Sequence, residues 1–366
     1  MYDRIHSVAV LGAGNGGLAL AAHLAHQGHR VALWNRSPAR VAPVAARGGV
    51  RLALPGLAAT FAPIDVATTR MADALAGARV VLVAVPASGH ADVARKCAPH
   101  LRDGQTVLLL PGRTGGALEL RQVLRQSGCR ARVLLGEANT FPFAARAIGP
   151  AEAVVYGAKT ELLAAALPAA RTPELLAACR PLLPMLAAAR SVLHTSLGNV
   201  GSILHPVITL LNARRIEAGE AFDFYAEGVT PRVAAVLTAA DRGLERVGVV
   251  AVGGGNPAYV GIKAPHTLEH RYLLEDVPTG LVPLLELGAA AGLALPTLAG
   301  LIDLARLTLG GEPWPRQRTL DALGLAGLSP ASIRAVVAGE RALAASAPLG
   351  RPRWEAGLLP QIAIGA

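Results

Sequence analysis

A chain of 366 residues is longer than one compact hydrophobic core usually allows, so its length predicts two domains. Hydrophobic residues make up 52% of the chain and charged residues 16%, which excludes a predominantly disordered protein. The net charge of +10 comes from Lys and Arg that are spread along the chain without a basic run interleaved with aromatics. The composition therefore argues against a nucleic-acid-binding protein and suits a protein whose ligands are small anions.

The first half of the chain alternates short apolar runs with segments of helical periodicity. Strands are predicted at residues 7–11, 30–34, 80–85, 106–110, 133–135 and 154–159, the last near the edge of the sheet. A helix over residues 18–27 connects the first two strands, and helix-length segments separate the others. Strands that alternate with helices predict an α/β domain with a doubly wound parallel sheet.

From about residue 181 the pattern changes to long Ala- and Leu-rich segments with helical spacing and no convincing strand. Thr230 followed by Pro231 is typical of a helix N-cap and first turn, so a helix is predicted from there through about residue 247. The Gly-rich residues 253–257 then predict a loop. We therefore expect an α/β domain at residues 1–180 and a mainly α-helical domain at residues 181–366.

The turn after the first predicted strand carries a phosphate-binding pattern. The sequence GAGNGG, which includes Gly12, Gly14, Asn15, Gly16 and Gly17, matches GxGxxG directly between a strand and a helix. Gly12 allows the tight turn, Gly14 the approach of a pyrophosphate, and Gly17 the close packing of helix on strand, while the helix N-terminus offers free N–H groups. The pattern predicts a Rossmann dinucleotide-binding domain. A Gly-rich turn that binds nothing is the alternative.

The end of the second predicted strand bears on the choice of dinucleotide. An NAD-binding domain normally carries an acid there, whereas this chain has Asn35, Arg36 and Ser37. Because Arg36 and Ser37 can pair with a 2′-phosphate, the sequence favours NADP(H) over NAD(H). The alternative is a solvated Arg36 and a loosely selective adenine side. Pro86, after the strand at 80–85, is expected on the nicotinamide side unless it merely ends the strand.

Two segments of the helical half carry candidate catalytic residues. His205 precedes Pro206, which is expected to kink the chain or to start a new helix there, so that the imidazole points into a cleft. A satisfied core histidine is the alternative. Arg271 and Asp276 do not share a helix face, but a break before Pro278 would aim both into one cavity, the guanidinium for a substrate carboxylate and the carboxylate for a protonated imidazole. Surface ion pairs with helix neighbours are the alternative for both.

At these residues the sequence resembles the octopine/nopaline (opine) dehydrogenase family. The two most specific matches are the His-Pro segment and the RYLLEDVP segment, and together the matches span nearly the whole chain. The matching sequences are VAVLGAGNGGLALAAHLA, VLVAVPASGH, GEANTFPFAAR, GNVGSILHPVITLLNA, FYAEGVTP and RYLLEDVPTGLVP.

The resemblance implies an NAD(P)-dependent oxidoreductase acting on a CH–NH group. Such an enzyme condenses an α-keto acid, such as pyruvate, with the amine of an amino acid and reduces the imine. The resemblance implies that His205 is the general acid/base, that Asp276 orients it, and that Arg271 clamps a substrate carboxylate. Glu137 is then a candidate partner for the amino-acid ammonium, and Asn199 is a further candidate for substrate binding.

The cysteines, the most apolar segment and the first residues of the chain bear on the cellular compartment and on the binding partners that we expect. Cys97, Cys129 and Cys179 are odd in number and lack CxxC or CxxH spacing, so neither disulfides nor a metal site is expected. The most apolar charge-free segment, residues 191–213, contains His, Asn and Pro and is interpreted as buried helix rather than a membrane span. The chain enters a strand and a Gly-rich turn at once, leaving no room for a signal peptide. We expect a cytoplasmic protein, a homodimer, with small-molecule substrates and no membrane or nucleic-acid partner.

Two alternative functions remain open. A carbonyl-reducing enzyme of the glycerol-3-phosphate dehydrogenase or ketopantoate reductase type would share the domain arrangement but rely on a catalytic lysine. The chain has three lysines, Lys96, Lys159 and Lys263, of which Lys263 keeps this reading open. A non-enzymatic NADP(H) sensor would keep the Gly-rich turn but would not need the candidate catalytic residues of the helical half.

Overall fold

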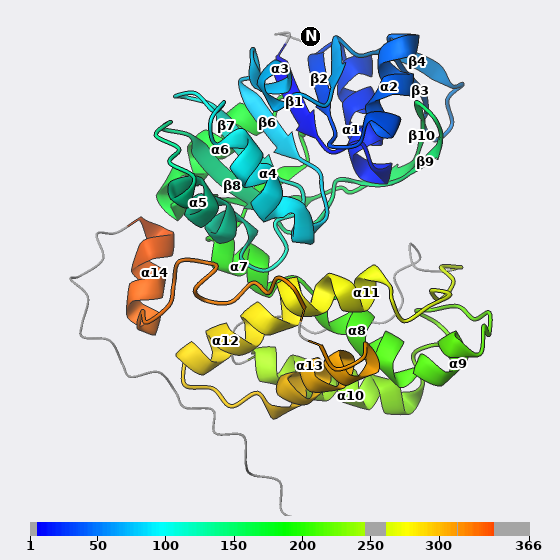
Figure 1. The fold of residues 1–366 in the computed structure, drawn as a ribbon, viewed down its shortest axis with the longest axis vertical. Helices are drawn as coiled ribbons and strands as arrows, with labels where there is room; N and C mark the ends of the chain where they lie inside the picture. Colours follow the sequence, from blue (N-terminus) through cyan, green and yellow to red (C-terminus); the bar gives the residue numbers. More distant parts are fainter. Residues whose placement is uncertain (1–5, 246–260, 313, 340–366) are drawn as a thin grey trace, which may run out of the picture.

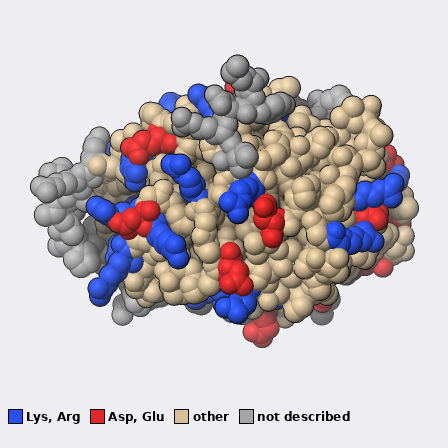
Figure 2. All heavy atoms as spheres, turned by 90° about the horizontal axis from the view of Figure 1, so that it is seen from above, with Lys and Arg blue, Asp and Glu red and all other residues tan. Residues whose placement is uncertain are grey.

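The computed structural model describes residues 6–245, 261–312 and 314–339. Figure 1 shows an α/β part, which holds the first half of the chain, above a group of helices from the second half. The loop predicted at residues 253–257 lies outside the described residues. On the face drawn in Figure 2, basic side chains are interspersed with acidic ones rather than gathered in one patch.

The α/β part is built on an eight-stranded sheet with the strand order β12-β11-β8-β7-β6-β1-β2-β5. Neighbouring strands are parallel except for β8 and β11, which run antiparallel. The strands are β1 (Ser7–Leu11), β2 (Arg30–Trp34), β5 (Val66–Thr68), β6 (Val80–Val83), β7 (Thr106–Leu109), β8 (Leu134–Ala138), β11 (Leu162–Leu167) and β12 (Leu186–Ala188).

Helices cover both faces of this sheet, because its strands are apolar on both sides. One core cluster joins Val8 and Val10 of β1 to α1 and α6, and another joins Ala9 and Leu11 to α3, α4 and α5. The helices of this part are α1 (Asn15–His26), α2 (Pro38–Arg47), α3 (Met71–Leu75), η1 (Ala87–Gly89), α4 (His90–Cys97), α5 (Gly116–Gln126), η2 (Ala169–Arg171), α6 (Thr172–Cys179) and α7 (Val192–Leu197).

A second, four-stranded sheet packs against α1, and its presence corrects one prediction. Its strands, in the order β4-β3-β10-β9, are β3 (Gly49–Ala53), β4 (Thr60–Pro63), β9 (Phe143–Gly149) and β10 (Glu152–Ala158). The strand predicted at 154–159 is thus β10 of this sheet, so its assignment to the edge of the main sheet is wrong. Ala153 and Val155 are buried whereas Tyr156 is exposed, which is the alternation of a strand with one solvated face.

The second half of the chain forms a helical core of its own. The core cluster of this part joins α8, α10, η4, α12 and α13. Thr230 accepts a hydrogen bond from the backbone N–H of Val233 (3.3 Å), so the N-cap predicted for α10 is confirmed. The described helices of this half of the chain are α8 (Gly201–Leu211), α9 (Ala213–Glu217), α10 (Pro231–Glu245), α11 (Arg271–Leu274), the π-helical η4 (Val277–Leu281), α12 (Val282–Ala290), α13 (Pro296–Thr308) and α14 (Pro330–Ala338), the last of which packs outside this core.

Two prolines that were expected to interrupt helices differ in their surroundings. Pro206 lies inside α8, so the prediction that a new helix starts there is wrong: the helix continues with one backbone donor fewer, and its buried side chains hold it in the helical core. Before Pro278, α11 ends at Leu274 and Glu275 lies in a turn, so the break predicted between Arg271 and Asp276 is present. Pro278 itself lies in η4, where the backbone widens to a π-helical turn before α12.

The predicted architecture of a doubly wound parallel sheet followed by a mainly helical domain is confirmed. The main sheet includes β12, which lies beyond residue 180, so we propose that the first domain continues to about residue 188. The chain also returns to the first domain near its end, since Leu323, Ile333 and Val337 pack in the cluster of α3, α4 and α5. Among the described residues, no helix combines the length and apolarity needed to cross a membrane.

Candidate active site

The turn between β1 and α1 has the close backbone approaches that its glycines predict. Gly12 has φ +125°, and a Cβ on it would lie 2.5 Å from the carbonyl oxygen of Ala84. A Cβ on Gly17 would overlap the carbonyl oxygen of Gly12, so α1 packs directly on the turn. Among the residues that the structure describes, a Cβ on Gly14 would meet nothing within 4 Å, and no side chain caps α1. The open side at Gly14 and the uncapped N–H groups of α1 fit the pyrophosphate of a dinucleotide.

The other two residues of this motif connect α1 to the second sheet. The side-chain oxygen of Asn15 accepts a hydrogen bond from the backbone N–H of Ala147 on β9 (3.1 Å). A Cβ on Gly16 would lie 2.7 Å from the ring of Phe141. The side-chain oxygen of Asn15 is therefore engaged by the protein, while its backbone N–H belongs to the first turn of α1, where a phosphate can bind.

The residues after β2 lie as a turn that leads into α2. The side chain of Asn35 accepts from the backbone N–H of Ser37 (2.9 Å), and Ser37 is the N-cap residue of α2. Arg36 is exposed and makes no hydrogen bond among the described residues. Pro86 is exposed at the start of η1, after β6. Residues 35–37 carry no carboxylate that would repel a 2′-phosphate.

His205 is held on three sides. Its Nδ1 lies 2.7 Å from Oδ2 of Asp276, and its Nε2 lies 2.9 Å from the hydroxyl of Tyr225. The ring of Tyr272 stacks on the imidazole with centroids 4.3 Å apart. A carboxylate only accepts hydrogen bonds, so Nδ1 carries the proton, and Nε2 of the neutral ring accepts from Tyr225. Asp276 is 1% exposed, which makes this contact a desolvated one.

The structure thus brings His205 of α8 and Asp276 at the start of η4 together, as the sequence predicted. It adds Tyr225, which the sequence analysis named only within the segment FYAEGVTP. Tyr225 lies in the segment between α9 and α10, and no local pattern marks it. Its proximity to the histidine arises from the packing of Phe224 and Tyr225 in the helical core.

Arg113 is a second residue that sequence reasoning missed. It lies in the Gly-rich loop after β7, and its Nη1 donates to Oδ1 of Asn199 (3.3 Å) and lies 3.9 Å from Oδ1 of Asp276. Asn199 in turn donates to the hydroxyl of Thr114 (3.2 Å). The signal available in the sequence was the position of this loop at the carboxyl end of a parallel strand, where ligands bind in doubly wound sheets.

Arg271 is not in contact with His205 or Asp276. Its Nε lies 3.3 Å from Glu275 one turn along, and its side chain is 50% exposed. The other oxygen of Glu275 accepts a hydrogen bond from the backbone N–H of Ala87 (3.0 Å), which connects this helix to the loop after β6. The observed contact of Arg271 is therefore the ion pair with a helix neighbour that was its alternative interpretation.

Glu137 lies apart from this cluster. Its carboxylate is fully buried and accepts hydrogen bonds from Thr195 (2.6 Å), Ser196 (3.0 Å) and the backbone N–H of Ala117 (2.7 Å). Burial raises the pKa of this carboxyl group, and the three donors oppose that rise. The structure does not bring Glu137 to a position where a substrate ammonium reaches it, because protein donors enclose both of its oxygens.

Arg318 connects the first domain to the helical half of the chain close to the His205–Asp276 pair. Its side chain is buried and donates to Glu119 on α5 (2.6 Å) and to the carbonyl oxygens of Thr114 (2.9 Å) and Ala87 (3.2 Å). Its backbone N–H donates to the carbonyl oxygen of Pro278 in η4 (2.9 Å). The loops after β6 and β7 are thereby fixed to the segment that carries Asp276.

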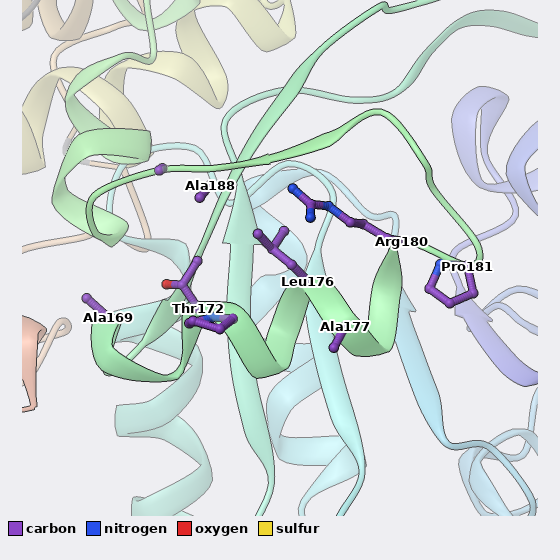
Figure 3. A pocket seen from close by; sticks show the side chains of 9 residues that line it. Ala169, Thr172, Leu176, Ala177, Arg180, Pro181 and Ala188 are labelled. Carbon is purple, nitrogen blue, oxygen red and sulfur yellow. The ribbon is translucent and has the colours of Figure 1, made fainter.

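A surface cavity of about 790 Å³ lies elsewhere, beside α6 and β12 (Figure 3). The one charged side chain in its lining is Arg180, which donates to the backbone oxygen of Leu186 (2.9 Å). The cavity offers no acid–base group, so it is not the candidate active site. In the described ranges, no three His, Cys, Asp or Glu side chains are grouped as metal ligands.

Known families match both halves of the chain. The family described as NAD/NADP octopine/nopaline dehydrogenase, alpha-helical domain, matches residues 188–252 and 249–309. The NAD-dependent glycerol-3-phosphate dehydrogenase N-terminus matches residues 7–122. The second match is confined to the dinucleotide-binding part, whereas the first covers the segment that holds both His205 and Asp276.

Three similar proteins extend these matches over most of the chain. The structure of octopine dehydrogenase with NADH and L-arginine has a TM-score of 0.75 at 22% identity and covers 92% of this chain and 98% of that one. NADP⁺-bound yersinopine dehydrogenase has a TM-score of 0.68 at 19% identity, covering 93% and 99%. The opine dehydrogenase of Arthrobacter sp. (strain 1C) is 39% identical over 355 residues, which are 90% of this chain and 98% of that protein. This chain therefore belongs to the opine dehydrogenase family of NAD(P)-dependent oxidoreductases.

Proposed function

We propose that this chain condenses an α-keto acid, such as pyruvate, with the amine of an amino acid and reduces the resulting imine with NADPH. The observation that carries the proposal is the His205–Asp276 contact of 2.7 Å, with Asp276 buried. Histidine with a buried carboxylate at Nδ1 is suited to general acid/base chemistry, because the carboxylate fixes the tautomer and stabilises the imidazolium. Membership of the family supports the same reaction class.

In this proposal the neutral His205 takes a proton from the substrate amine through Nε2. The free amine attacks the keto carbon, and the imidazolium returns the proton to the oxygen, which gives a carbinolamine. The attacking nitrogen then releases a second proton, which His205 passes to the hydroxyl group, and this group leaves as water as the C=N bond forms. Asp276 stabilises the imidazolium between these steps. The hydroxyl of Tyr225, 2.9 Å from Nε2, marks the position that a reacting substrate atom would take. A bound nicotinamide supplies the hydride that reduces the imine carbon.

We further propose that Gly12, Gly14 and Gly17 with the N-terminus of α1 hold the pyrophosphate, and that NADP(H) is preferred to NAD(H). The exposed guanidinium of Arg36 beside Ser37, with no acid at positions 35–37, supports the preference. The NADP⁺ bound by yersinopine dehydrogenase is compatible with it. Pro86, at the start of η1, is assigned to the nicotinamide side.

Arg271 and Asn199 are proposed to contribute to substrate binding. Arg271 is 50% exposed and so remains reachable for a substrate carboxylate despite its pair with Glu275. Asn199 is 5% exposed and acts through its bond to Arg113. We also propose a cytoplasmic homodimer. The exposed Leu304 and Leu307 on α13 support self-association.

The alternative of a lysine-dependent carbonyl reductase has less support. Lys263 lies 2.6 Å from Asp223, with its side chain 63% exposed, and this pair raises the pKa of the lysine. A lysine so paired is held in its charged form and is a poor proton acceptor. No described contact joins it to His205 or Asp276.

Amine dependence of cofactor oxidation tests the proposed function. NADPH consumption is followed with pyruvate alone and with pyruvate plus each of a panel of amino acids, and NADH is run in parallel. We expect oxidation only when an amino acid is present, a lower KM for NADPH than for NADH, and a secondary-amine dicarboxylate as the product by mass spectrometry. Oxidation at the same rate without any amine would instead identify a carbonyl reductase.

A further inference from the structure

Arg113 occupies a backbone conformation that long side chains avoid. Its φ is 59°, in the left-handed region, where glycine carries no steric cost and a residue with a Cβ does. The loop has glycine at positions 112, 115 and 116, so glycine is common in this segment. Backbone strain at a residue with a cationic side chain indicates that the contacts of this side chain have a function.

The guanidinium of Arg113 points from the first domain to the catalytic pair of the second. Its Nη1 is hydrogen-bonded to Asn199 and lies 3.9 Å from Asp276. A Cβ on Gly201 would lie 3.2 Å from Nη1 of Arg113 and 3.2 Å from Cε1 of His205. Guanidinium and imidazole thus approach the same point on α8, where the glycine leaves room for both.

Most of the binding capacity of this guanidinium is unused by the protein. Within the described part of the chain, its Nε and Nη2 make no hydrogen bond, and the side chain is 18% exposed. Asp276 is the carboxylate within 4 Å, and its other oxygen is 2.7 Å from His205. When His205 is protonated, two cations therefore share one carboxylate, and the group has a net charge of +1.

Arg271 differs from Arg113 in this respect. It forms a closer pair with Glu275, at 3.3 Å, and half of its side chain is exposed. Its charge is therefore neutralised by a carboxylate and screened by solvent. Beside His205, the positive charge that lacks a dedicated partner belongs to Arg113.

We propose that Arg113 binds the carboxylate of the α-keto acid, so that Arg271 is left for the carboxylate of the amino acid. This assignment rests on the proposed function, whose product has two carboxylates and needs a cationic partner for each. The keto-acid carboxylate is one bond from the carbon that reacts beside His205, so its partner must lie next to the imidazole. Two free N–H groups of one guanidinium bind a carboxylate as a fork.

An uncharged substrate analogue distinguishes two roles of Arg113: binding the substrate carboxylate and stabilising the fold. Values of kcat/KM are measured for pyruvate and for its uncharged amide, pyruvamide, at saturating NADPH and amine. We expect the native enzyme to prefer pyruvate by about 100-fold, the scale of a desolvated charge-assisted pair. In Arg113→Met and Arg113→Gly this preference should fall to within a few-fold of one, through loss of pyruvate turnover rather than gain of amide turnover.

Two variants guard against a purely structural effect. Arg113→Gly removes the side chain at a φ that glycine adopts freely, so its Tm should equal or exceed that of the native protein. Arg271→Met is the matched control: it should raise the KM of the amino acid and leave the preference for pyruvate over pyruvamide intact.

The assignment is overturned if the Arg113 variants lose pyruvate and pyruvamide turnover equally, or if Arg271→Met abolishes the preference in their place. Pyruvate binding to the NADPH complex, measured by quenching of NADPH fluorescence, separates this result from failure of the proposed function. Pyruvate that binds the native complex and not Arg113→Met supports the assignment even if no amine is turned over. Equal binding to both overturns it even if condensation is observed.

Discussion

At the imidazole of His205, geometry assigns each nitrogen a separate task. Nδ1 faces the buried Asp276 at 2.7 Å and stays protonated, so Nε2 is the atom that exchanges a proton with substrate. Tyr272 stacks on the ring and limits its rotation. The same carboxylate is 3.9 Å from Arg113, so one buried anion contacts an imidazole and a guanidinium from different domains.

A second histidine provides a pH test at the residue scale. His90 is fully buried, and its pKa lies well below its usual value because burial disfavours the charged ring and Arg318 and Arg113 repel it. The folded protein therefore keeps His90 neutral while the unfolded chain takes up a proton below about pH 6.5. Stability from this group is present above that pH and is lost as the pH falls.

We expect the free energy of unfolding to fall by up to about 1.4 kcal/mol per pH unit below pH 6.5 because of this one residue. Denaturant titrations at pH 7.5 and 5.5 measure the loss, and His90→Gln, which has no titrating group, should reduce it. Equal losses in the native protein and in His90→Gln would show that other groups cause the acid sensitivity.

At the scale of elements, α1 depends on two glycines for different reasons. A Cβ on Gly17 would overlap the backbone of Gly12 and force α1 away from β1, whereas a Cβ on Gly14 would enter open space. Gly17→Ala is therefore expected to lower the Tm strongly. Gly14→Ala should keep the Tm within a few degrees and raise the KM for NADPH, because its methyl group projects into the space left for the pyrophosphate.

Thermal unfolding and cofactor kinetics of the two variants, compared side by side, measure this contrast. Gly14→Ala is the matched control for the added methyl group itself. A Gly14→Ala variant with unchanged affinity for NADPH would remove this turn from the cofactor site.

The elements that could be predicted from sequence are those whose burial is visible as a short run of apolar residues. The strands at 7–11, 30–34, 80–85 and 106–110 are buried on both faces, so their apolar runs identified them. The strand β10 was found but placed in the wrong sheet, because a strand's sequence does not specify its neighbour. A kink or a new helix was predicted at Pro206, but α8 continues through it, because tertiary packing that outweighs one lost hydrogen bond cannot be recognised in the local sequence.

The candidate site, like the fold, could be predicted only where a local sequence pattern marks the residues. His205 and Asp276 occur in distinctive segments, and their contact required only that these segments meet. Arg113 and Tyr225 lie in a loop and in a segment between helices, and their roles depend on distances set by the fold. Glu137 looked accessible at a strand end, but Thr195 and Ser196 of α7 cover it.

At the scale of the whole molecule, the site exists because the two halves are fixed to each other. Arg318 bonds from a position after α13 to Glu119, Thr114 and Ala87, all in the first domain. Glu275 adds a bond to the backbone of Ala87 from the helix that contains Arg271. These contacts set the loop that carries Arg113 against the helices that carry His205 and Asp276.

The central claim is that His205 is the proton-transfer group of an enzyme that condenses a keto acid with an amine. Single-turnover NADPH oxidation with pyruvate and the best amino acid, measured for the native protein and for His205→Ala, tests it most directly. We predict a rate about 100- to 10,000-fold lower in the variant, the usual scale for loss of a general acid/base, with the Kd for NADPH unchanged. A variant that turns over at the native rate would contradict the account.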